Sequence, residues 1–440
     1  MGPYVDSIVP DERLPATAAV VIIGGGIIGV SAALWLARRG IAVVLCEKGH
    51  VAGEQSSRNW GWCRQAGRDE REMPLIVESM RQWRMMSNEQ GLDTGYEQCE
   101  TLYVSTSEHE EQGFEQWLAM AKPYEIGARM VRGEPLARLM PGAARTFRSG
   151  LHVPTDGRAE PQSAVPAMAR AAQAAGARII TQCPVLALQL SAGRISGVVT
   201  SRGTIASDTV LLAGGAWSSG FCASLGIRLP QLKVLGSVMR TAPIAGGPET
   251  CGWVGDLGYR KRRDGGYTLA LGTDHRVPVV PDSLRFLKDF IPQLRQGWKS
   301  LRPVFNQQSL EEWTARWRGD VASTLQRNAV LDPLHCASLN RRALAAMTQL
   351  YPAFGQARVV QHWGGYIDVT PDVVPYIGGS EVCPGLTVAT GFSGHGFGIG
   401  PAAGQLAAAM AIGQGSSLAA PALRLSRFED GSPMVLGASI

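Results

Sequence analysis

Residues 18–48, AAVVIIGGGIIGVSAALWLARRGIAVVLCEK, decide the fold class of this chain. The β-branched run Val20–Ile23 has the composition of a strand and no helical spacing, so it predicts a buried strand. Gly24, Gly26 and Gly29 follow it in G-x-G-x-x-G spacing, and a helix-forming segment then runs to Gly40. A strand, a glycine turn and a helix in this order predict the first half of a βαβ unit.

A second apolar strand completes that unit. It covers Ile41–Cys46 and ends in Glu47, an acid 18 positions beyond Gly29. In a dinucleotide-binding unit the glycines allow a tight turn and a close approach to the pyrophosphate, which the helix N-terminus faces with free N–H groups. Glu47 is placed to accept hydrogen bonds from both ribose hydroxyls, which favours an adenosine without a 2′-phosphate. The unit alone leaves NAD and FAD open as cofactors.

Length and charge exclude other classes of protein. The 440 residues provide enough chain for two or three domains, and a hydrophobic content of 45% fits a globular protein rather than a disordered one. The formal charge of +5 arises from 42 basic and 37 acidic residues that are spread along the sequence. Because no dense basic face emerges, we expect no nucleic-acid partner.

Cysteine spacing and hydropathy give expectations about metal binding and cellular location. The eight cysteines occur singly, without a C-x-x-C pair or a neighbouring histidine at ligand spacing, so we expect no metal and free thiols. The N-terminal segment is acidic and lacks the apolar core of a signal peptide, and no apolar run reaches 18 residues. We therefore expect a cytoplasmic protein without a transmembrane segment.

Beyond Glu47 the sequence alternates between buried strands and more polar, mixed segments. A loop over 49–67 is expected to return over the nucleotide, and the glycine-rich turn at 391–400 leads into an alanine-rich helix. We expect helices at 69–90, 108–122, 134–140, 162–175, 282–291 and 341–350. We expect strands at 101–105, 178–181, 184–190, 195–200, 208–217, 233–241, 267–272, 359–365 and 385–390.

Four segments together resemble a known family. They are the glycine stretch ending in Glu47, Ser56-Ser57-Arg58-Asn59-Trp60-Gly61, the run VLLAGGAWS at 210–218, and GFSGHGF at 391–397. Supporting matches are Asp156-Gly157 with Pro161, Asp264-Gly265, and Thr370-Pro371-Asp372 with Pro375. In this order and spacing they resemble the D-amino-acid oxidase family of flavoproteins, which includes glycine oxidase, sarcosine oxidase and D-amino-acid dehydrogenases. The resemblance covers nearly the whole chain.

The resemblance implies an α/β fold with two discontinuous domains. A Rossmann-like FAD-binding domain would comprise 18–95, 150–228 and 350–430, and a smaller antiparallel-sheet substrate domain of the α+β type would comprise 96–149 and 229–349. It also implies that the cofactor is FAD rather than NAD. The second glycine turn would then bring a helix N-terminus to the pyrimidine edge of the flavin, where negative charge accumulates on reduction.

The matching positions give a set of expected FAD contacts. Ser56 and Ser57 are suited to phosphate or ribitol oxygens, the backbone of Val185 to the adenine, and the imidazole N–H of His395 to the charge of the reduced ring. The full expected set is Gly24, Gly26, Ile27, Ile28, Gly29, Glu47, Lys48, Ser56, Ser57, Asn59, Trp60, Gly61, Val185, Ala213, Gly214, Trp217, Gly364, Gly394, His395, Gly396, Phe397 and Gly398.

This chain departs from its relatives at three positions of the implied substrate site. Ile367 stands where many D-amino-acid dehydrogenases carry an arginine that grips the carboxylate, and Gly398 stands where sarcosine oxidases carry a lysine. Gly365 corresponds approximately to the cysteine that binds flavin covalently in monomeric sarcosine oxidases, so we expect FAD to be bound non-covalently.

Other residues could hold the substrate. Arg64 lies in the loop that carries substrate-side arginines in sarcosine oxidases, with Arg58 as the alternative from the same loop. Tyr259 and Arg260 precede a hairpin in the substrate module. Aromatic residues crowd the segments expected at the flavin and suggest a pocket for a bulky or secondary amine: Trp60, Trp62, Trp363 and Tyr366. The expected catalytic set is His395, Arg64, Tyr259, Arg260 and Trp363.

The resemblance implies an oxidoreductase that transfers a hydride from a carbon bearing nitrogen to FAD and gives an imine. Because the usual anion grips for primary amino acids are absent, we favour a secondary amine or an N-substituted amino acid as substrate. The alternatives are a 2-hydroxy-acid dehydrogenase and a flavin-binding subunit of a multi-subunit dehydrogenase. Oxygen and an electron carrier both stay open as acceptors, and an oligomer or a partner subunit is possible.

Overall fold

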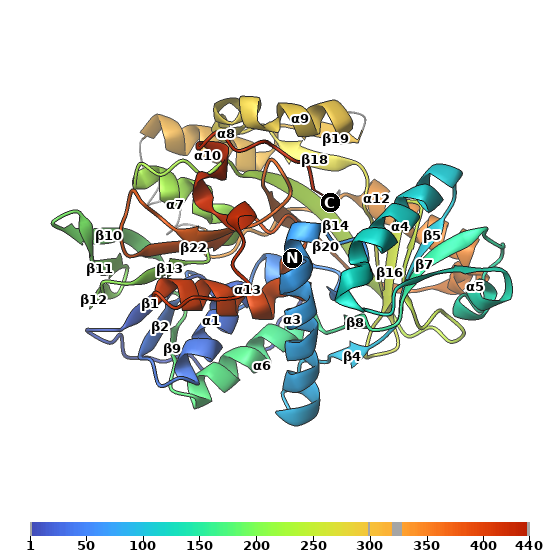
Figure 1. Cartoon of the computed structure of the whole chain (residues 1–440), viewed down its shortest axis with the longest axis horizontal. Helices are drawn as coiled ribbons and strands as arrows, with labels where there is room; N and C mark the ends of the chain where they lie inside the picture. Colours follow the sequence, from blue (N-terminus) through green and yellow to red (C-terminus); the bar gives the residue numbers. More distant parts are fainter. Residues whose placement is uncertain (1, 298–299, 319–327, 438–440) are drawn as a thin grey trace.

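A six-stranded sheet forms one side of the molecule in the computed structural model, which describes residues 2–297, 300–318 and 328–437 (Figure 1). Its order is β21-β22-β13-β1-β2-β9, and every pairing except β21–β22 is parallel. The strands are β1 (Val20–Ile23), β2 (Val43–Cys46), β9 (Arg178–Ile180), β13 (Val210–Leu212), β21 (Tyr376–Gly379) and β22 (Leu386–Thr390).

Helices cover this sheet and place the two glycine turns near one another. α1 packs against both α13 and α6, and α3 packs against α13. These helices are α1 (Ile27–Ala37), α3 (Met73–Arg84), α6 (Pro161–Ala174) and α13 (Gly396–Ala411). Since α1 and α13 begin directly after the two glycine turns, their packing brings residues 24–29 and 391–398 to the same side of the sheet.

A ten-stranded sheet, mainly antiparallel, forms the other side (Figure 1). Its order is β19-β18-β14-β17-β16-β15-β5-β7-β6, and β20 pairs with β14 beside this path. The strands are β5 (Thr101–Ser105), β6 (Arg129–Arg132), β7 (Ser149–Val153), β14 (Leu232–Thr241), β15 (Cys251–Val254), β16 (Leu257–Lys261), β17 (Tyr267–Leu271), β18 (His275–Pro278), β19 (Leu301–Val304) and β20 (Val359–Val369). β20 and β7 fall in ranges expected for the cofactor domain, so the division by residue range stays a prediction.

The remaining elements connect the two large sheets or extend them. Two small sheets are β10 (Val185–Ser191) with β11 (Arg194–Thr200) and β12 (Gly203–Ala206), and β3 (Trp62–Cys63) with β8 (Gly157–Arg158) and β4 (Glu97–Gln98). The other helices are α2 (Gln55–Arg58), α4 (Glu108–Ala121), α5 (Gly133–Leu139), α7 (Ser218–Ser224), α8 (Pro281–Arg285), α9 (Leu287–Gly297), α10 (Gln307–Arg318) and α12 (Ala337–Leu350). None of the helices in the described ranges is long and apolar enough to cross a membrane.

Four expected elements differ in the structure. The strand expected at 208–217 is β13, which ends at Leu212, and a 3₁₀ turn at Gly215–Trp217 follows it. The helix expected at 69–90 is a 3₁₀ turn, then α3, then a π-helical turn at Met85–Glu89; α3 begins at Met73 because Pro74 is favoured in a first turn. The helix expected at 282–291 is broken at Phe286, whose ring is fully buried between the sheet and α9. The loop expected at 49–67 contains α2 and β3.

Candidate cofactor and substrate site

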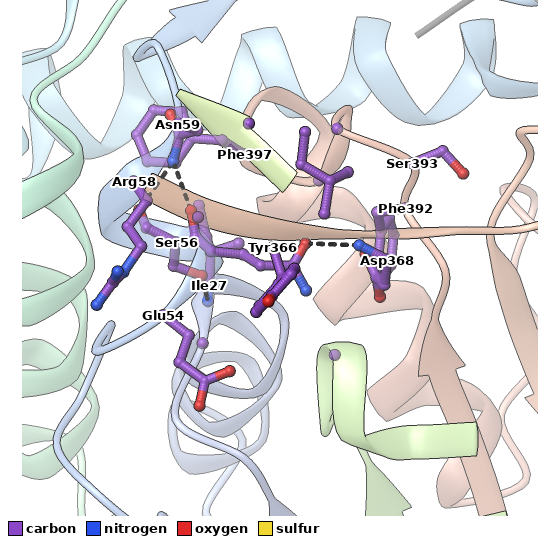
Figure 2. A pocket seen from close by; sticks show the side chains of 18 of the residues that line it. Ile27, Glu54, Ser56, Arg58, Asn59, Tyr366, Asp368, Phe392, Ser393 and Phe397 are labelled. Carbon is purple, nitrogen blue, oxygen red and sulfur yellow. Dashed lines mark hydrogen bonds between the residues drawn. The ribbon is translucent and has the colours of Figure 1, made fainter. Parts of the chain in front are cut away.

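One continuous cavity links the two glycine turns. It is lined at one end by the carboxyl termini of β1, β2 and β13, where ligands bind in open α/β sheets. It continues past α2 to β14, β20 and the start of α13. Figure 2 shows Glu54, Ser56, Arg58 and Asn59 on one side of this cavity and Asp368, Phe392 and Ser393 on the other.

The first glycine turn leaves no room for side chains. Gly24 has a φ of +109°, and a Cβ there would lie 2.4 Å from the carbonyl oxygen of Ala213. A Cβ on Gly29 would lie 2.0 Å from the carbonyl oxygen of Gly24, so Gly29 serves helix–strand packing and does not line the cavity. Gly24 and Gly26 do line it, which leaves the N-terminus of α1 open to a ligand.

Glu47 and Ser56 hold this turn in place. Glu47 Oε2 accepts a hydrogen bond from the N–H of Gly25 and Oε1 accepts one from the N–H of Gly49, both over 2.7 Å. Burial raises the pKa of the Glu47 carboxyl. The Oγ of Ser56 accepts from the N–H of Ile27 over 2.9 Å, as Figure 2 shows. Each carboxylate oxygen can accept a further hydrogen bond, so Glu47 still has acceptor sites for the expected ribose hydroxyls.

Asp368 fixes the second glycine turn, and the sequence analysis did not identify it. Its Oδ2 accepts hydrogen bonds from the N–H of Gly391 over 2.9 Å, from Nε2 of Gln231 over 3.0 Å and from Oγ1 of Thr390 over 3.2 Å. Asp368 lines the cavity, and burial raises its pKa to about 6. A buried carboxyl therefore sets the position of the turn from which α13 starts.

His395 lies in this turn, and one nitrogen of its imidazole contacts a buried carboxylate. Nδ1 lies 2.9 Å from Oε2 of Glu72, and both side chains are buried. Burial lowers the pKa of His395; the Glu72 pKa lies below its ordinary value because the charges of His395 and Arg68 outweigh the effect of its own burial. His395 and Glu72 thus share one buried hydrogen bond. Nε2 is buried with no partner among the described residues and His395 lines the cavity, so the expected N–H toward the flavin stays a prediction.

Most of the expected cofactor contacts line the cavity. They are Gly24, Gly26, Ile27, Ile28, Glu47, Lys48, Ser56, Asn59, Trp60, Val185, Ala213, Gly214, Trp217, Gly394, His395, Gly396, Phe397 and Gly398. A long cavity with a glycine cradle and a helix N-terminus at each end has the form that a dinucleotide such as FAD requires. The residues present therefore fit FAD.

Four expected contacts lie outside the cavity lining. Gly29 packs against Gly24, and Ser57 is fully buried with its Oγ donating to the carbonyl oxygen of Glu54 over 3.2 Å. A Cβ on Gly61 would meet the carbonyl oxygen of Ala159 at 2.6 Å, and one on Gly364 would meet that of Pro333 at 2.5 Å. We interpret these four positions as support for the loops that carry the site.

Four cationic side chains line the cavity, and three of them lie near a carboxylate. Lys48 Nζ lies 2.6 Å from Glu54, Arg58 Nη1 lies 2.8 Å from Asp332, and Arg68 Nη1 lies 3.8 Å from Glu72. Burial lowers the pKa of Arg68 to about 10. Arg64 instead donates to the carbonyl oxygen of Ala66 and lies 5.8 Å from the ring of Trp62 and 5.6 Å from that of Tyr103. No carboxylate of the described residues pairs with Arg64.

Indole rings form a wall beside Arg64. Trp60 and Trp253 stack with ring centroids 5.6 Å apart, and Trp62 meets Trp60 edge-on at 5.4 Å. Two glycines make room for this stack, because a Cβ on Gly258 would lie 2.3 Å from the Trp60 ring and one on Gly272 would lie 2.2 Å from the Trp253 ring. Trp60, Trp62 and Tyr366 line the cavity as expected, and Trp253, which was not expected, lines it as well.

Three expected catalytic residues lie away from the cavity, which corrects their assignment as substrate contacts. Arg260 is 1% exposed; its Nη1 lies 2.8 Å from Oε1 of Glu160, and its Nε donates to the carbonyl oxygen of Trp60 over 2.6 Å. Tyr259 is buried with its hydroxyl 3.2 Å from that of Tyr351. Trp363 is buried and donates from Nε1 to the carbonyl oxygen of Arg58 over 3.0 Å. Arg260 and Trp363 thus fix the loop that carries Arg58 and Trp60.

Sequence reasoning missed Glu54, Arg68, Glu72, Trp253 and Asp368. Arg68 and Glu72 lie four positions apart, but their contacts with His395 depend on the fold, as does the meeting of the other three residues at the cavity. The one local signal was the position of Asp368, four residues before the matched Asp372. Within the described part of the chain, no group of three or more His, Cys, Asp or Glu side chains is arranged to hold a metal ion.

Comparisons with known proteins agree with this geometry. A family model described as "DAO: FAD dependent oxidoreductase" matches residues 19–410. The sarcosine oxidase subunit beta of an Arthrobacter species is 25% identical over 430 residues, which cover 94% of this chain and 91% of that protein. Human mitochondrial sarcosine dehydrogenase is 28% identical over 245 residues, 54% of this chain, and the match spans 27% of that protein. This chain therefore matches only about a quarter of the dehydrogenase.

A solved structure extends the similarity to the whole fold. The L-amino acid deaminase from Proteus myxofaciens, in complex with anthranilate, superimposes with a TM-score of 0.92 and 28% sequence identity. The superposition covers 98% of this chain and 97% of that one, so it includes both large sheets.

Proposed function

The chain belongs to the FAD-dependent oxidoreductase family, and on that premise we propose that it oxidises an amine that carries a carboxylate. The favoured substrate is a secondary amine or N-substituted amino acid, and the product is the corresponding imine. FAD is held without a covalent bond, since Gly365 supplies no nucleophile where monomeric sarcosine oxidases carry a cysteine. Bound FAD supplies the chemistry, because it accepts a hydride equivalent from the carbon next to nitrogen.

Arg64 carries this proposal. Arg64 lines the cavity, and no carboxylate of the described residues pairs with it. Lys48 and Arg58 also line the cavity, but each already forms an ion pair. A guanidinium can hold a carboxylate through two parallel hydrogen bonds. Arg64 would therefore bind the substrate carboxylate and orient the carbon next to nitrogen toward the isoalloxazine ring.

The aromatic wall supports a bulky substituent on the substrate. Trp60, Trp62 and Trp253 line the same cavity as Arg64, and their rings present apolar surface with few polar groups. Such a wall excludes water from the substrate and favours a large apolar or N-alkyl group. The Proteus deaminase with its anthranilate supports the same view, since that ligand combines a carboxylate with an aromatic ring.

The chemistry is tested by anaerobic reduction of the purified holoprotein. Its visible flavin absorbance is followed after addition of N-methyl amino acids, primary amino acids, amines without a carboxylate, and 2-hydroxy acids. The proposal predicts rapid bleaching by carboxylate-bearing amines and slow or no bleaching by the other two classes. Bleaching by 2-hydroxy acids alone would overturn it and establish the hydroxy-acid dehydrogenase.

A flavin-binding subunit is the second candidate, and a relative's name favours it. The Arthrobacter protein that matches 94% of this chain is a subunit of sarcosine oxidase. Gel filtration combined with turnover against oxygen and against an artificial dye separates the two possibilities. Turnover by the isolated chain with either acceptor excludes the subunit-only function.

A further inference from the structure

Two cysteine thiols touch one another although 152 positions separate them in the sequence. Cys99 lies just before β5, and Cys251 is the first residue of β15. Their Sγ atoms are 3.3 Å apart, and both are free thiols. We propose that Cys99 and Cys251 form a redox-active dithiol that closes to an intramolecular disulfide when it meets a peroxide.

Hydrogen bonds hold the backbone at both thiols. β5 and β15 are parallel neighbours, with Thr101 opposite Cys251. The N–H of Cys251 donates to the carbonyl oxygen of Glu100 over 2.9 Å, and the N–H of Cys99 donates to that of Asp156 over 3.0 Å. A disulfide bond is about 2.05 Å long, so the sulfur atoms need to approach by little more than about 1 Å.

Exposure assigns the order of the two steps. Cys99 is partly exposed, whereas Cys251 is fully buried, and burial raises the pKa of the Cys251 thiol well above its usual range. A peroxide therefore reaches Cys99 first, and the Cys99 sulfur takes one oxygen to give a sulfenic acid and one water. The Cys251 sulfur then attacks the Cys99 sulfur, the S–S bond forms, and a second water leaves. The two thiols lose two electrons and two protons, which reduce the peroxide to water.

The disulfide would join the strands beneath the indole wall. Trp253 follows Cys251 by two positions, so the two side chains point to the same face of β15. Tyr103 of β5 lies opposite Trp253, with ring centroids 6.2 Å apart. The bond would therefore tie together the two strands that hold these rings.

The test is peptide mapping of the holoprotein after treatment with hydrogen peroxide. Free thiols are alkylated under denaturing conditions, and the digest is analysed without reductant. We expect one linked peptide pair that contains Cys99 and Cys251, a loss of two hydrogen masses, and reversal by dithiothreitol. The melting temperature of the oxidised protein should rise by roughly 2–5 °C, since the bond closes a long loop of the unfolded chain.

Three variants make the result specific. Cys99→Ser, at a partly exposed position, should abolish both the linked peptide and the temperature shift, and Cys251→Ser should do the same. Cys63→Ser removes a buried thiol from nearby β3 and should leave both unchanged. The proposal is overturned if peroxide carries Cys99 to a sulfinic acid while Cys251 stays reduced, or if Cys99 links to Cys63 instead. Neither outcome bears on the amine oxidation proposed above.

Discussion

Glu72 Oε2 lies 2.9 Å from Nδ1 of His395, and the two residues are 323 positions apart in the chain. Glu72 is fully buried and His395 is 4% exposed. Arg68 completes the group, with Nη1 3.8 Å from the same carboxylate oxygen and Nη2 donating to the carbonyl oxygen of His395 over 3.3 Å. A buried carboxylate thus joins the loop that carries Arg64 to the turn that begins α13.

Replacing Glu72 should destabilise the protein markedly. Glu72→Ala leaves the Arg68 cation buried without its counter-charge, so we expect the free energy of unfolding to fall by about 3 kcal/mol. Glu72→Gln should cost less, since its amide oxygen can still accept from His395. Urea unfolding at saturating FAD measures both. The control is Glu78→Ala in α3, which removes a partly exposed ion pair with Arg81. It should change the free energy of unfolding by less than about 1 kcal/mol. Equal losses for Glu72→Ala and Glu78→Ala would contradict this account.

Glu160 should make the stability depend on acid pH. Burial raises its pKa, but the charge and hydrogen bond of Arg260 outweigh this and hold the pKa at about 2, below the ordinary 4.5. Because the folded-state pKa is the lower one, the stabilisation is complete above pH 4.5 and is lost as the pH falls toward 2. The linked free energy is roughly 3 kcal/mol. Glu160→Gln should therefore flatten the acid limb of a plot of unfolding free energy against pH; an unchanged slope between wild type and variant would argue against the ion pair.

Asp368 should act in the opposite sense. Burial raises its pKa from 3.8 to about 6, so the folded state binds the proton more tightly than the unfolded chain. Its contribution is present below pH 3.8 and is lost as the pH rises through 6. We compare the melting temperatures of wild type and Asp368→Asn. The wild-type value minus the variant value should decrease between pH 4 and pH 6, the window set by these two pKa values, and should level off above pH 6. A difference that stays constant over this window would show that Asp368 does not titrate there.

The indole wall should be sensitive to the two glycines behind it. A Cβ at Gly258 would lie 2.3 Å from the Trp60 ring, so Gly258→Ala must push this ring toward the cavity. We expect weaker binding of bulky substrates, seen as a rise in KM, and a stability loss of about 1–3 kcal/mol. The matched control is Gly355→Ala, where the nearest atom would be 3.9 Å away. Similar KM values for both variants would place the substrate elsewhere.

The parts of the fold that local sequence determines were predicted well. The β1–α1–β2 unit was predicted because its strands, glycines and helix follow one another directly, and the family resemblance and the FAD cofactor are confirmed. The expected helix at 108–122 and the expected strand at 101–105 match α4 and β5 within one residue. In these elements the periodicity of the sequence is not overridden by distant contacts.

The side chains of the site were harder to predict because they meet through tertiary contacts. Arg260 is an example: its place before a hairpin of the substrate module suggested a substrate contact, but the fold buries it against Glu160, 100 positions away. The partner of His395 could not be inferred either, since Glu72 stands in a charged, helical segment that resembles a solvated surface. Trp253 lies at the cavity because β15, which carries it, pairs with β5 and β16.

The central claim is that Arg64 binds the carboxylate of an amine substrate beside FAD. The most direct measurement is the concentration dependence of anaerobic flavin reduction in wild type, Arg64→Lys and Arg64→Met, each with an N-methyl amino acid and with the same amine lacking its carboxylate. We predict that Arg64→Met weakens the apparent affinity for the carboxylate-bearing amine about 10- to 100-fold, that Arg64→Lys weakens it less, and that neither variant alters reduction by the decarboxylated amine. Equal effects of Arg64→Met on both amines, or no effect on either, would contradict the claim.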